Sequence, residues 1–299
     1  MITILGPTAS GKTALAARIA YELNGEVISA DSRQVYKGMD IGSGKDYGDY
    51  LINGLHVPCH LIDIAEPGTE YNIFRYQQDF LPVYNNIRSR GKLPVLCGGS
   101  GMYLEAVLKG YRLNEAGKDQ DFLNSLEDKT EEELTVILKS LKNLHNKTDF
   151  EDRQRLLKAI EIGYHARQSH HEQTFPVIPS TVFGISYPRG LLKKRITDRL
   201  KNRLTGGLTI EIERLIGHGV DPEKLMRYGL EYKFGTLYIT GKITSEELFN
   251  MLNKAIHQFS KRQMTWFRRM ERHGITIQWI DGRLNMENKL AFIRDHFHP

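Results

Sequence analysis

A phosphate-binding loop at the start of the chain constrains the fold more than any other sequence feature. Residues 6–13 read Gly-Pro-Thr-Ala-Ser-Gly-Lys-Thr, which fits the pattern G-x-x-x-x-G-K-[ST] at every fixed position. An apolar run, Ile2–Leu5, precedes the motif and a helical pattern, Ala14–Leu23, follows it, as the strand-loop-helix context of a P-loop requires. Backbone N–H groups of such a loop close around phosphate oxygens. The sequence therefore predicts an α/β fold and a ligand that carries a phosphoanhydride.

Two side chains add chemistry to this loop. Lys12 is expected to reach the outer phosphate, and the Thr13 hydroxyl is the candidate ligand for Mg²⁺, the metal cofactor that we expect. The predicted diphosphate- or nucleotide-binding residues are Gly6, Pro7, Thr8, Ala9, Ser10, Gly11, Lys12 and Thr13. The motif by itself leaves kinase, hydrolase and transferase chemistry open.

Two later runs that are typical of buried strands also lead into polar loops. Residues 26–30 are followed by Asp31-Ser32-Arg33-Gln34, and residues 92–97 by a second glycine-rich turn at 98–101. Strands that alternate with helices predict a parallel sheet flanked by helices, and ligands of such sheets bind beyond the carboxyl ends of the strands. We therefore expect a P-loop NTPase-like α/β fold in which the three polar loops converge.

An all-helical stretch interrupts this pattern. From about residue 113 no strand-like run appears, and a capping box at 130–133 opens a helix that carries Leu144 near the end of its apolar face. The sheet pattern resumes at 181–186. The chain is therefore expected to hold a discontinuous catalytic core, 1–112 and 181–299, and an inserted helical subdomain, 113–180.

Positive charge gathers on two predicted helices. The chain holds 41 Lys and Arg against 36 Asp and Glu, a net charge of +5. Residues 189–203 carry seven cations and one acid, and the helix after a second capping box at 244–247 has a basic side. A solvated charged face is one interpretation, and a polyanionic partner is the other. The excess around Arg195 and Arg199 favours nucleic acid, whose phosphates these two residues are expected to contact.

The remaining composition bears on the cellular setting. Cys59 and Cys97 show no C-x-x-C spacing, so neither a zinc site nor a disulfide framework is expected. No apolar run approaches the ~20 residues of a membrane span, and a P-loop at residue 6 leaves no room for a signal peptide. We expect a cytoplasmic monomer with no membrane partner.

Seven segments spread over nearly the whole chain carry a family resemblance. They are 6–13, 29–36, 39–42, 60–63, 98–103, 154–155 and 261–267. In this order they resemble the tRNA dimethylallyltransferases, also called tRNA isopentenyltransferases or the IPP transferase family. The resemblance implies transfer of the dimethylallyl group from dimethylallyl diphosphate to the exocyclic amine of the adenosine adjacent to the anticodon in tRNA, with release of diphosphate.

The resemblance also implies residue roles. The P-loop would hold the diphosphate, while Lys12 and Mg²⁺ on Thr13 neutralise the charge of the departing group. Asp31 would accept the proton of the amine. Ser100, which stands where the family has threonine, keeps the hydroxyl and stays a polar site contact. The implied catalytic residues are Asp31, Lys12, Thr13 and Ser100.

Contact with tRNA is implied for two segments, one in the core and one in the insertion. Their residues are Asp31, Ser32, Arg33, Gln34, Gln154, Arg155 and Lys158. The target base would be swung out of the anticodon loop into the reaction channel.

The chain departs from the family pattern at several positions. The family usually has Gly-Thr-Ala-Lys-Pro where this chain has Gly42-Ser43-Gly44-Lys45-Asp46, and Gly-Tyr-Lys-Glu where it has Glu231-Tyr232-Lys233-Phe234. A family arginine that is thought to help hold the diphosphate is replaced by His257, which carries charge only when protonated. These departures mark a divergent member.

Three other functions compete with this interpretation. An ATP-dependent small-molecule kinase needs an acidic Mg²⁺-organising residue, whereas the strand at 92–97 ends in Gly98-Gly99. Prenyl transfer to a free adenine nucleotide keeps the chemistry and changes the acceptor, but the inserted helices favour tRNA. An RNA-binding protein with a vestigial loop disagrees with the intact Lys12, Thr13 and Asp31.

Overall fold

The computed structural model describes residues 1–113, 122, 124–141, 153–168 and 175–297, without the side chains of 154 and 165–168. The chain divides into two compact units. The core unit comprises Met1–Lys109 and Val177–Pro299, and the helical unit comprises Gly110–Pro176.

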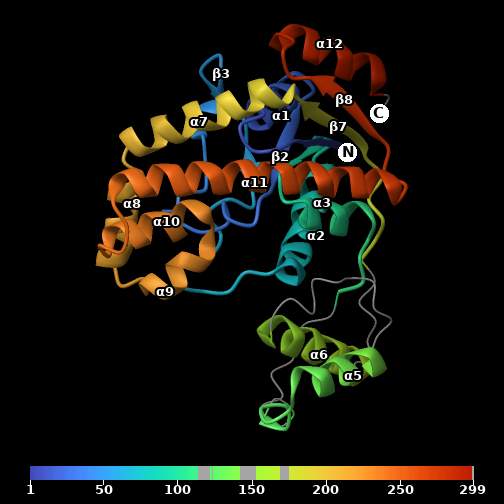
Figure 1. Cartoon of the computed structure of the whole chain (residues 1–299). Helices are drawn as coiled ribbons and strands as arrows, with labels where there is room; N and C mark the ends of the chain where they lie inside the picture. The colour runs from blue at the N-terminus through green and yellow to red at the C-terminus, as the bar shows by residue number, and fades with distance from the viewer. Residues whose placement is uncertain (114–121, 123, 142–152, 169–174, 298–299) are drawn as a thin grey trace. The chain divides into compact units, whose positions relative to one another are not determined.

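A parallel sheet forms the centre of the core unit (Figure 1). Its strands are ordered β5-β2-β6-β1-β7-β8, and every neighbouring pair is parallel. The predicted α/β fold with a parallel sheet is thereby confirmed. The strand bounds are β1 Ile2–Leu5, β2 Gly25–Ala30, β5 Cys59–His60, β6 Leu93–Gly98, β7 Thr181–Ser186 and β8 Ile277–Asp281. A short antiparallel hairpin lies outside this sheet, β3 Leu51–Ile52 and β4 Leu55–His56.

Helices pack on the sheet and around one another through two apolar clusters. One cluster joins the strands to α1 and α12 through residues such as Ile4, Ala16 and Ile293. The other joins α7, α8, α10 and α11 to the segment after β2 through residues such as Tyr36 and Leu252. The helix bounds are α1 Lys12–Glu22, α2 Ile73–Ser89, α3 Gly101–Leu108, α7 Arg189–Thr205, α8 Leu208–Gly217, α9 Pro222–Leu225, α10 Leu230–Ile239, α11 Ser245–Arg272 and α12 Met286–His296.

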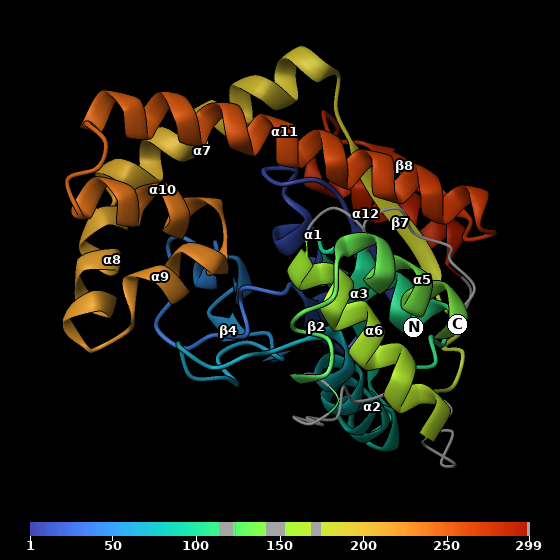
Figure 2. The ribbon, with the colours of Figure 1, turned by 60° about the horizontal axis from the view of Figure 1, so that its bottom comes forward.

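The long helix α11 runs beside α7 across the core unit, as Figures 1 and 2 both show. It begins with the predicted capping box, because the Thr244 hydroxyl accepts from Glu247 N–H and the Glu247 carboxylate accepts from Thr244 N–H. Its 28 residues span about 42 Å at 1.5 Å per residue. One helix therefore reaches from α10 to α3.

The helical unit has its own small core. Its helices α5, Glu131–Leu141, and α6, Arg153–Gln168, pack through Leu134, Leu138 and Ile160. The capping box predicted at Thr130 is present, with Glu133 as its partner. Leu144, predicted for the same helix face, lies outside the described residues. Within the described ranges, no helix combines the length and apolar character that crossing a bilayer requires.

A buried carboxylate ties the amino-terminal end of β2 to its surroundings. Glu26 is 2% exposed, and it accepts two hydrogen bonds from the Arg90 guanidinium, at 2.5 and 2.6 Å. Lys92 Nζ lies 2.7 Å from the same carboxylate, and His60 Nε2 also lies at 2.7 Å. The hydrogen bonds from Arg90 are the main reason that the pKa of Glu26 lies well below its ordinary value.

Replacing this carboxylate should lower stability at neutral pH. We expect Glu26→Gln to reduce the free energy of unfolding by about 3 kcal/mol, because it removes the buried anion that two cations share. The lowered pKa means that the wild-type stabilisation is complete above the ordinary pKa of 4.5 and is lost as the pH falls further. Urea unfolding from pH 7 down to pH 3 measures both effects, and Glu66→Gln, in an exposed pair with Lys37, serves as the control. Equal stability of Glu26→Gln and wild type at pH 7 would contradict the assignment.

Candidate active site

The strand register brings three loops to one edge of the sheet. Leu5, the last residue of β1, pairs with Gly98, the last residue of β6. Gly98 also pairs with Ala30, the last residue of β2. A Cβ on Gly98 would overlap the Ala30 carbonyl, so glycine is required at this close approach. The loops at 6–13, 31–34 and 98–101 therefore leave the sheet side by side, as the sequence predicted.

The P-loop encloses a cradle at the amino terminus of α1. Ala9 and Gly11 adopt positive φ values of 61° and 80°, which turn the chain tightly between β1 and the helix. A Cβ on Gly6 would lie 2.6 Å from Ser10 Oγ. The first turn of α1 contains no acidic residue, and its N-cap makes no side-chain hydrogen bond. The exposed N–H groups and the helix dipole therefore favour an anion here.

Two side chains of the loop are available to a ligand. In the described part of the chain, neither the Lys12 ammonium nor the Thr13 hydroxyl has a hydrogen-bond or ion-pair partner. Burial is the main cause that lowers the pKa of Lys12, and the nearby charge of Arg199 lowers it further. A bound anion would therefore stabilise the charged form of Lys12 strongly.

Gln263 of α11 ties the P-loop to the second glycine-rich turn. Its Oε1 accepts from Thr8 N–H at 2.8 Å, and its Nε2 donates to the Gly99 carbonyl at 2.9 Å. A Cβ on Gly99 would come within 2.6 Å of Gln263 Nε2 and 3.4 Å of Lys12 Cε, so this glycine leaves room for both side chains. The sequence prediction gave Gln263 no role. The sequence signal that could have identified Gln263 is a polar side chain within the apolar stripe of a helix, because a buried polar group needs a hydrogen-bond partner.

Asp31 begins the second polar loop. Its Oδ1 accepts from Arg33 N–H at 2.9 Å, which closes a turn, while its Oδ2 has no hydrogen-bond partner among the described residues. Ser100 is joined to this loop, because its Oγ accepts from Ser32 N–H at 3.2 Å. One carboxylate oxygen of Asp31 is therefore held and the other is available for chemistry.

Gln34, predicted to contact tRNA, has internal partners. Its Oε1 accepts from the Ser29 hydroxyl at 3.0 Å, and its Nε2 donates to the Gly44 carbonyl at 3.0 Å. Gln34 thus ties the end of β2 to the loop that follows.

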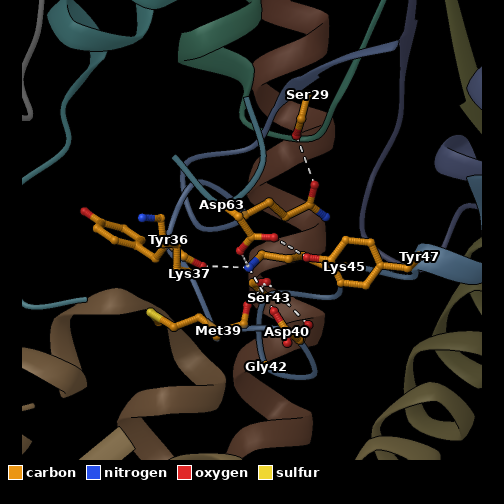
Figure 3. Close-up of polar contacts among 12 residues, drawn as sticks. Ser29, Tyr36, Lys37, Met39, Asp40, Gly42, Ser43, Lys45, Tyr47 and Asp63 are labelled. Carbon is orange, nitrogen blue, oxygen red and sulfur yellow. Dashed lines mark hydrogen bonds and ion pairs between the residues drawn. The ribbon is translucent and has the colours of Figure 1, made fainter. Parts of the chain in front are cut away.

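A buried lysine holds that loop in place, and Figure 3 shows its ammonium at the centre of the contacts. Lys45 has a fully buried side chain that donates to the Tyr36 carbonyl at 2.6 Å, to Asp40 Oδ1 at 2.9 Å and to Asp63. The Tyr47 hydroxyl donates to the second oxygen of Asp63. Lys45 is therefore fully occupied in supporting the polar loops.

Glu211 of α8 supports the same loop from the other side. Its carboxylate accepts from the backbone N–H groups of Asp40, Ile41 and Gly42 at 2.7 to 3.0 Å, and from the Tyr232 hydroxyl at 2.8 Å. The sequence prediction did not include Glu211, because nothing local to it signals three distant N–H donors.

Two arginines of α7 contact the P-loop. Arg195 Nε donates to the Ala9 carbonyl at 2.9 Å, and its guanidinium lies 4.8 Å from the centre of the Tyr187 ring. Arg199 Nη1 lies 3.5 Å from Thr8 Oγ1. The sequence analysis expects both residues to contact RNA phosphates, and that stays a prediction. In the structure both contact the P-loop, Arg195 from an exposed position and Arg199 from a partly buried one.

The remaining residues predicted for tRNA lie on α6 of the helical unit. Arg155 is exposed, and the Lys158 ammonium pairs with Glu161 at 2.9 Å. The side chain of Gln154 lies outside the described part.

A cavity of about 780 Å³ lies between α7 and α11 and reaches Pro7 of the P-loop. No carboxylate occurs among its lining residues, and its cations are Arg189, Lys193, Lys254, Lys261 and Arg268. His257 also lines it, and burial followed by the charge of Lys193 lowers the pKa of this histidine. His257 is therefore neutral at pH 7, so lysine and arginine supply the positive charge of this cavity.

Comparison with known proteins assigns the family. Residues 34–270 match the family model described as IPP transferase, and residues 1–53 match a second model, isopentenyl transferase. The chain belongs to the IPP transferase family. It is 55% identical to tRNA dimethylallyltransferase 2 of Bacteroides fragilis over 98% of this chain and 96% of that protein.

Solved structures of the family share the fold. The full-length tRNA isopentenylpyrophosphate transferase of Bacillus halodurans aligns with a TM-score of 0.71 at 29% identity, over 99% of this chain and 94% of that one. A eukaryotic dimethylallyltransferase that acts on tRNA aligns with a TM-score of 0.79 over 99% of this chain and 79% of that one. At 21% identity, the second likeness concerns the fold alone.

The unpaired cation of the P-loop gives a direct test of the cradle. We expect Lys12→Ala to weaken the binding of inorganic diphosphate about 100-fold, because it removes the partner-free charged donor of the cradle. Calorimetric titration of both proteins measures this, with exposed Lys37→Ala as the matched control. If Lys12→Ala bound diphosphate as wild type does, residues 6–13 would not be the anion site.

Proposed function

We propose that this protein transfers the dimethylallyl group from dimethylallyl diphosphate to the exocyclic amine of the adenosine adjacent to the anticodon in tRNA, releasing diphosphate. The observation that carries the proposal is the juxtaposition of the P-loop cradle with the free Oδ2 of Asp31, in a chain of the IPP transferase family. The cradle takes the leaving group, and the carboxylate takes the proton.

The donor binds through its diphosphate. The N–H groups at the start of α1, together with Lys12, Arg195 and Arg199, surround the anion and stabilise the charge that grows as the carbon–oxygen bond breaks. The donor reaches the cradle from the cavity beside Pro7, whose lining is cationic. The unpartnered Thr13 hydroxyl fits Mg²⁺ bound mainly by diphosphate oxygens and water. Such an ion, when bound, would neutralise part of the leaving group's charge.

The acceptor needs a base. The lone pair of an adenine exocyclic amine is delocalised into the ring, which makes the amine a weak nucleophile. As the new nitrogen–carbon bond forms and the carbon–oxygen bond to diphosphate breaks, one amine proton passes to Oδ2 of Asp31. The Arg33 N–H holds the other oxygen and orients the carboxylate. The Ser100 hydroxyl keeps the Asp31 loop in register through Ser32 N–H.

The tRNA is recognised by the polar loop after β2 and by the helical unit. The contacts that we propose are those of Asp31, Ser32, Arg33 and Gln34 in the core, and of Gln154, Arg155 and Lys158 on α6. The target adenosine leaves the anticodon loop to reach Asp31. We further propose that the protein acts on tRNA as a cytoplasmic monomer.

A free adenine nucleotide is the main alternative acceptor. Residues 1–53 match an isopentenyl transferase model, whereas the IPP transferase model covers 34–270 and with it the helical unit. Incubation with labelled dimethylallyl diphosphate and either total tRNA or AMP separates the two functions. We expect label in tRNA and none in AMP, and the reverse result would overturn the proposed acceptor.

The role of Asp31 can be tested with an isosteric change. Asp31→Asn keeps the Oδ1 acceptor for Arg33 N–H but cannot accept a proton, so we expect the single-turnover rate to fall about 100-fold or more. Binding of diphosphate and tRNA should change little. A wild-type rate in this variant would assign Asp31 to the turn alone.

The cationic cavity predicts a salt-dependent donor effect. The double variant Lys193→Glu, Lys254→Glu should raise the donor KM about tenfold at low salt, and the difference should shrink as salt screens the charges. The double variant Lys194→Glu, Lys201→Glu, whose sites lie on α7 outside the cavity lining, changes the net charge equally and is the matched control. Equal donor KM values for the two double variants would exclude this approach path.

A further inference from the structure

Four charged side chains from three elements meet beside the P-loop. Arg199 and Arg203 lie one turn apart on α7, Asp46 follows the loop held by Lys45, and Glu231 lies in the first turn of α10. Arg199 Nη2 is 2.5 Å from Asp46 Oδ2, and Arg203 Nη1 is 3.1 Å from Glu231 Oε1. Two like charges are therefore placed close together, each with its own carboxylate.

Arg199 and Arg203 both pack against Gly44. It adopts a φ of +73°, and a Cβ there would overlap Arg203 Nη2 and lie 2.7 Å from Arg199 Nη2. The Gln34 amide holds the Gly44 carbonyl at 3.0 Å. Gly44, Asp46 and Glu231 are positions at which the sequence departs from the family pattern, and the structure brings them into one cluster with Arg203.

The second pair is nearly enclosed. The side chains of Arg203 and Glu231 are 12% and 17% exposed. Burial, followed by the charge of Arg199, lowers the pKa of Arg203, while burial raises the pKa of Glu231 against the opposing effect of Arg203. Each member is costly to keep charged without the other. Glu231 therefore allows a second guanidinium to stay charged close to Arg199, beside the same glycine.

Arg199 lies between the Asp46 carboxylate and the cradle in which a diphosphate would bind. On one side its guanidinium contacts Asp46, and on the other it lies 3.5 Å from Thr8 of the cradle. The guanidinium groups of Arg199 and Arg203 both lie close to Gly44, so the charge of Arg203 repels that of Arg199. A diphosphate in the cradle would therefore compete with Asp46 for this arginine.

We propose that Arg203 and Glu231 are positioning residues that hold Arg199 at the diphosphate, and that Asp46 is the carboxylate which the diphosphate displaces from Arg199. The inference rests on the proposed function only in taking the P-loop as a diphosphate site. According to this inference, Arg203 and Glu231 affect the affinity for the donor and do not affect binding of the acceptor.

The pair is tested with a double-mutant cycle. We expect Arg203→Met and Glu231→Gln each to raise the dissociation constant of inorganic diphosphate and the donor KM about tenfold, with the tRNA KM unchanged. The double variant should be no worse than Arg203→Met alone, because both changes act through Arg199. Strictly additive losses, or a fall in kcat with unchanged diphosphate affinity, would overturn the proposal.

The variant Asp46→Asn should have the opposite effect on diphosphate affinity, and it leaves the Arg203–Glu231 pair intact. Removing the competing carboxylate should tighten diphosphate binding about threefold, because it also removes a negative charge near the anion. Weaker diphosphate binding in Asp46→Asn would show that Asp46 positions Arg199 and would overturn the displacement.

The matched control is Arg90→Met, which breaks an arginine–glutamate pair at the opposite end of β2 whose carboxylate is buried and whose guanidinium is partly exposed. It should lower the melting temperature while leaving diphosphate affinity unchanged. Titration with inorganic diphosphate uses no RNA, so its outcome does not depend on the acceptor. Failure of the tRNA assay with a normal diphosphate response would reject the proposed function and leave the role of the pair standing.

Discussion

The alignment of three strand ends is the constraint on which the rest of the site depends. Leu5, Ala30 and Gly98 are level with one another, so the residues that follow them share one edge of the sheet. Parallel strands with this register cannot deliver their loops anywhere else. A one-residue slip would turn the strand faces over and move the loops out of alignment. Gly98 holds the register closely, because only glycine fits beside the Ala30 carbonyl.

Most of the polar groups around this edge support other groups. Lys45 and Glu211 hold the 40–45 loop, Gln263 joins the P-loop to Gly99, and Ser100 joins the third loop to Ser32. These contacts leave few partner-free groups among the described residues of the cradle, chiefly the side chains of Ser10, Lys12 and Thr13 and one oxygen of Asp31. A site arranged in this way is preorganised, since its supporting groups need not move when the ligand arrives.

Positively charged side chains surround the cradle at increasing distance from the loop. Lys12 belongs to the loop, Arg195 and Arg199 contact the loop from α7, and Arg203, one turn further along α7, pairs with Glu231. Beyond them, the cavity between α7 and α11 presents cations without carboxylates in its lining. This distribution of charge supports the proposed approach of an anionic donor. Asp46 and Glu231 offset the repulsion between the charges of Arg199 and Arg203.

The sequence by itself determined the parallel α/β fold, the P-loop, the convergence of the three loops and the family, because these follow from local patterns such as glycine spacing and buried strands. It placed Lys12 and Asp31 correctly at one edge, since each follows directly on a strand end. Only the tertiary structure decided that Arg195 and Arg199 of α7 contact the P-loop, 186 and 191 residues away from their partners Ala9 and Thr8. Local sequence patterns also could not predict the roles of Gln263 and Glu211 or the contact of Gly44 with Arg203. Each depends on segments more than 150 residues apart, whose contact is set by how the helices pack and by no signal near either residue.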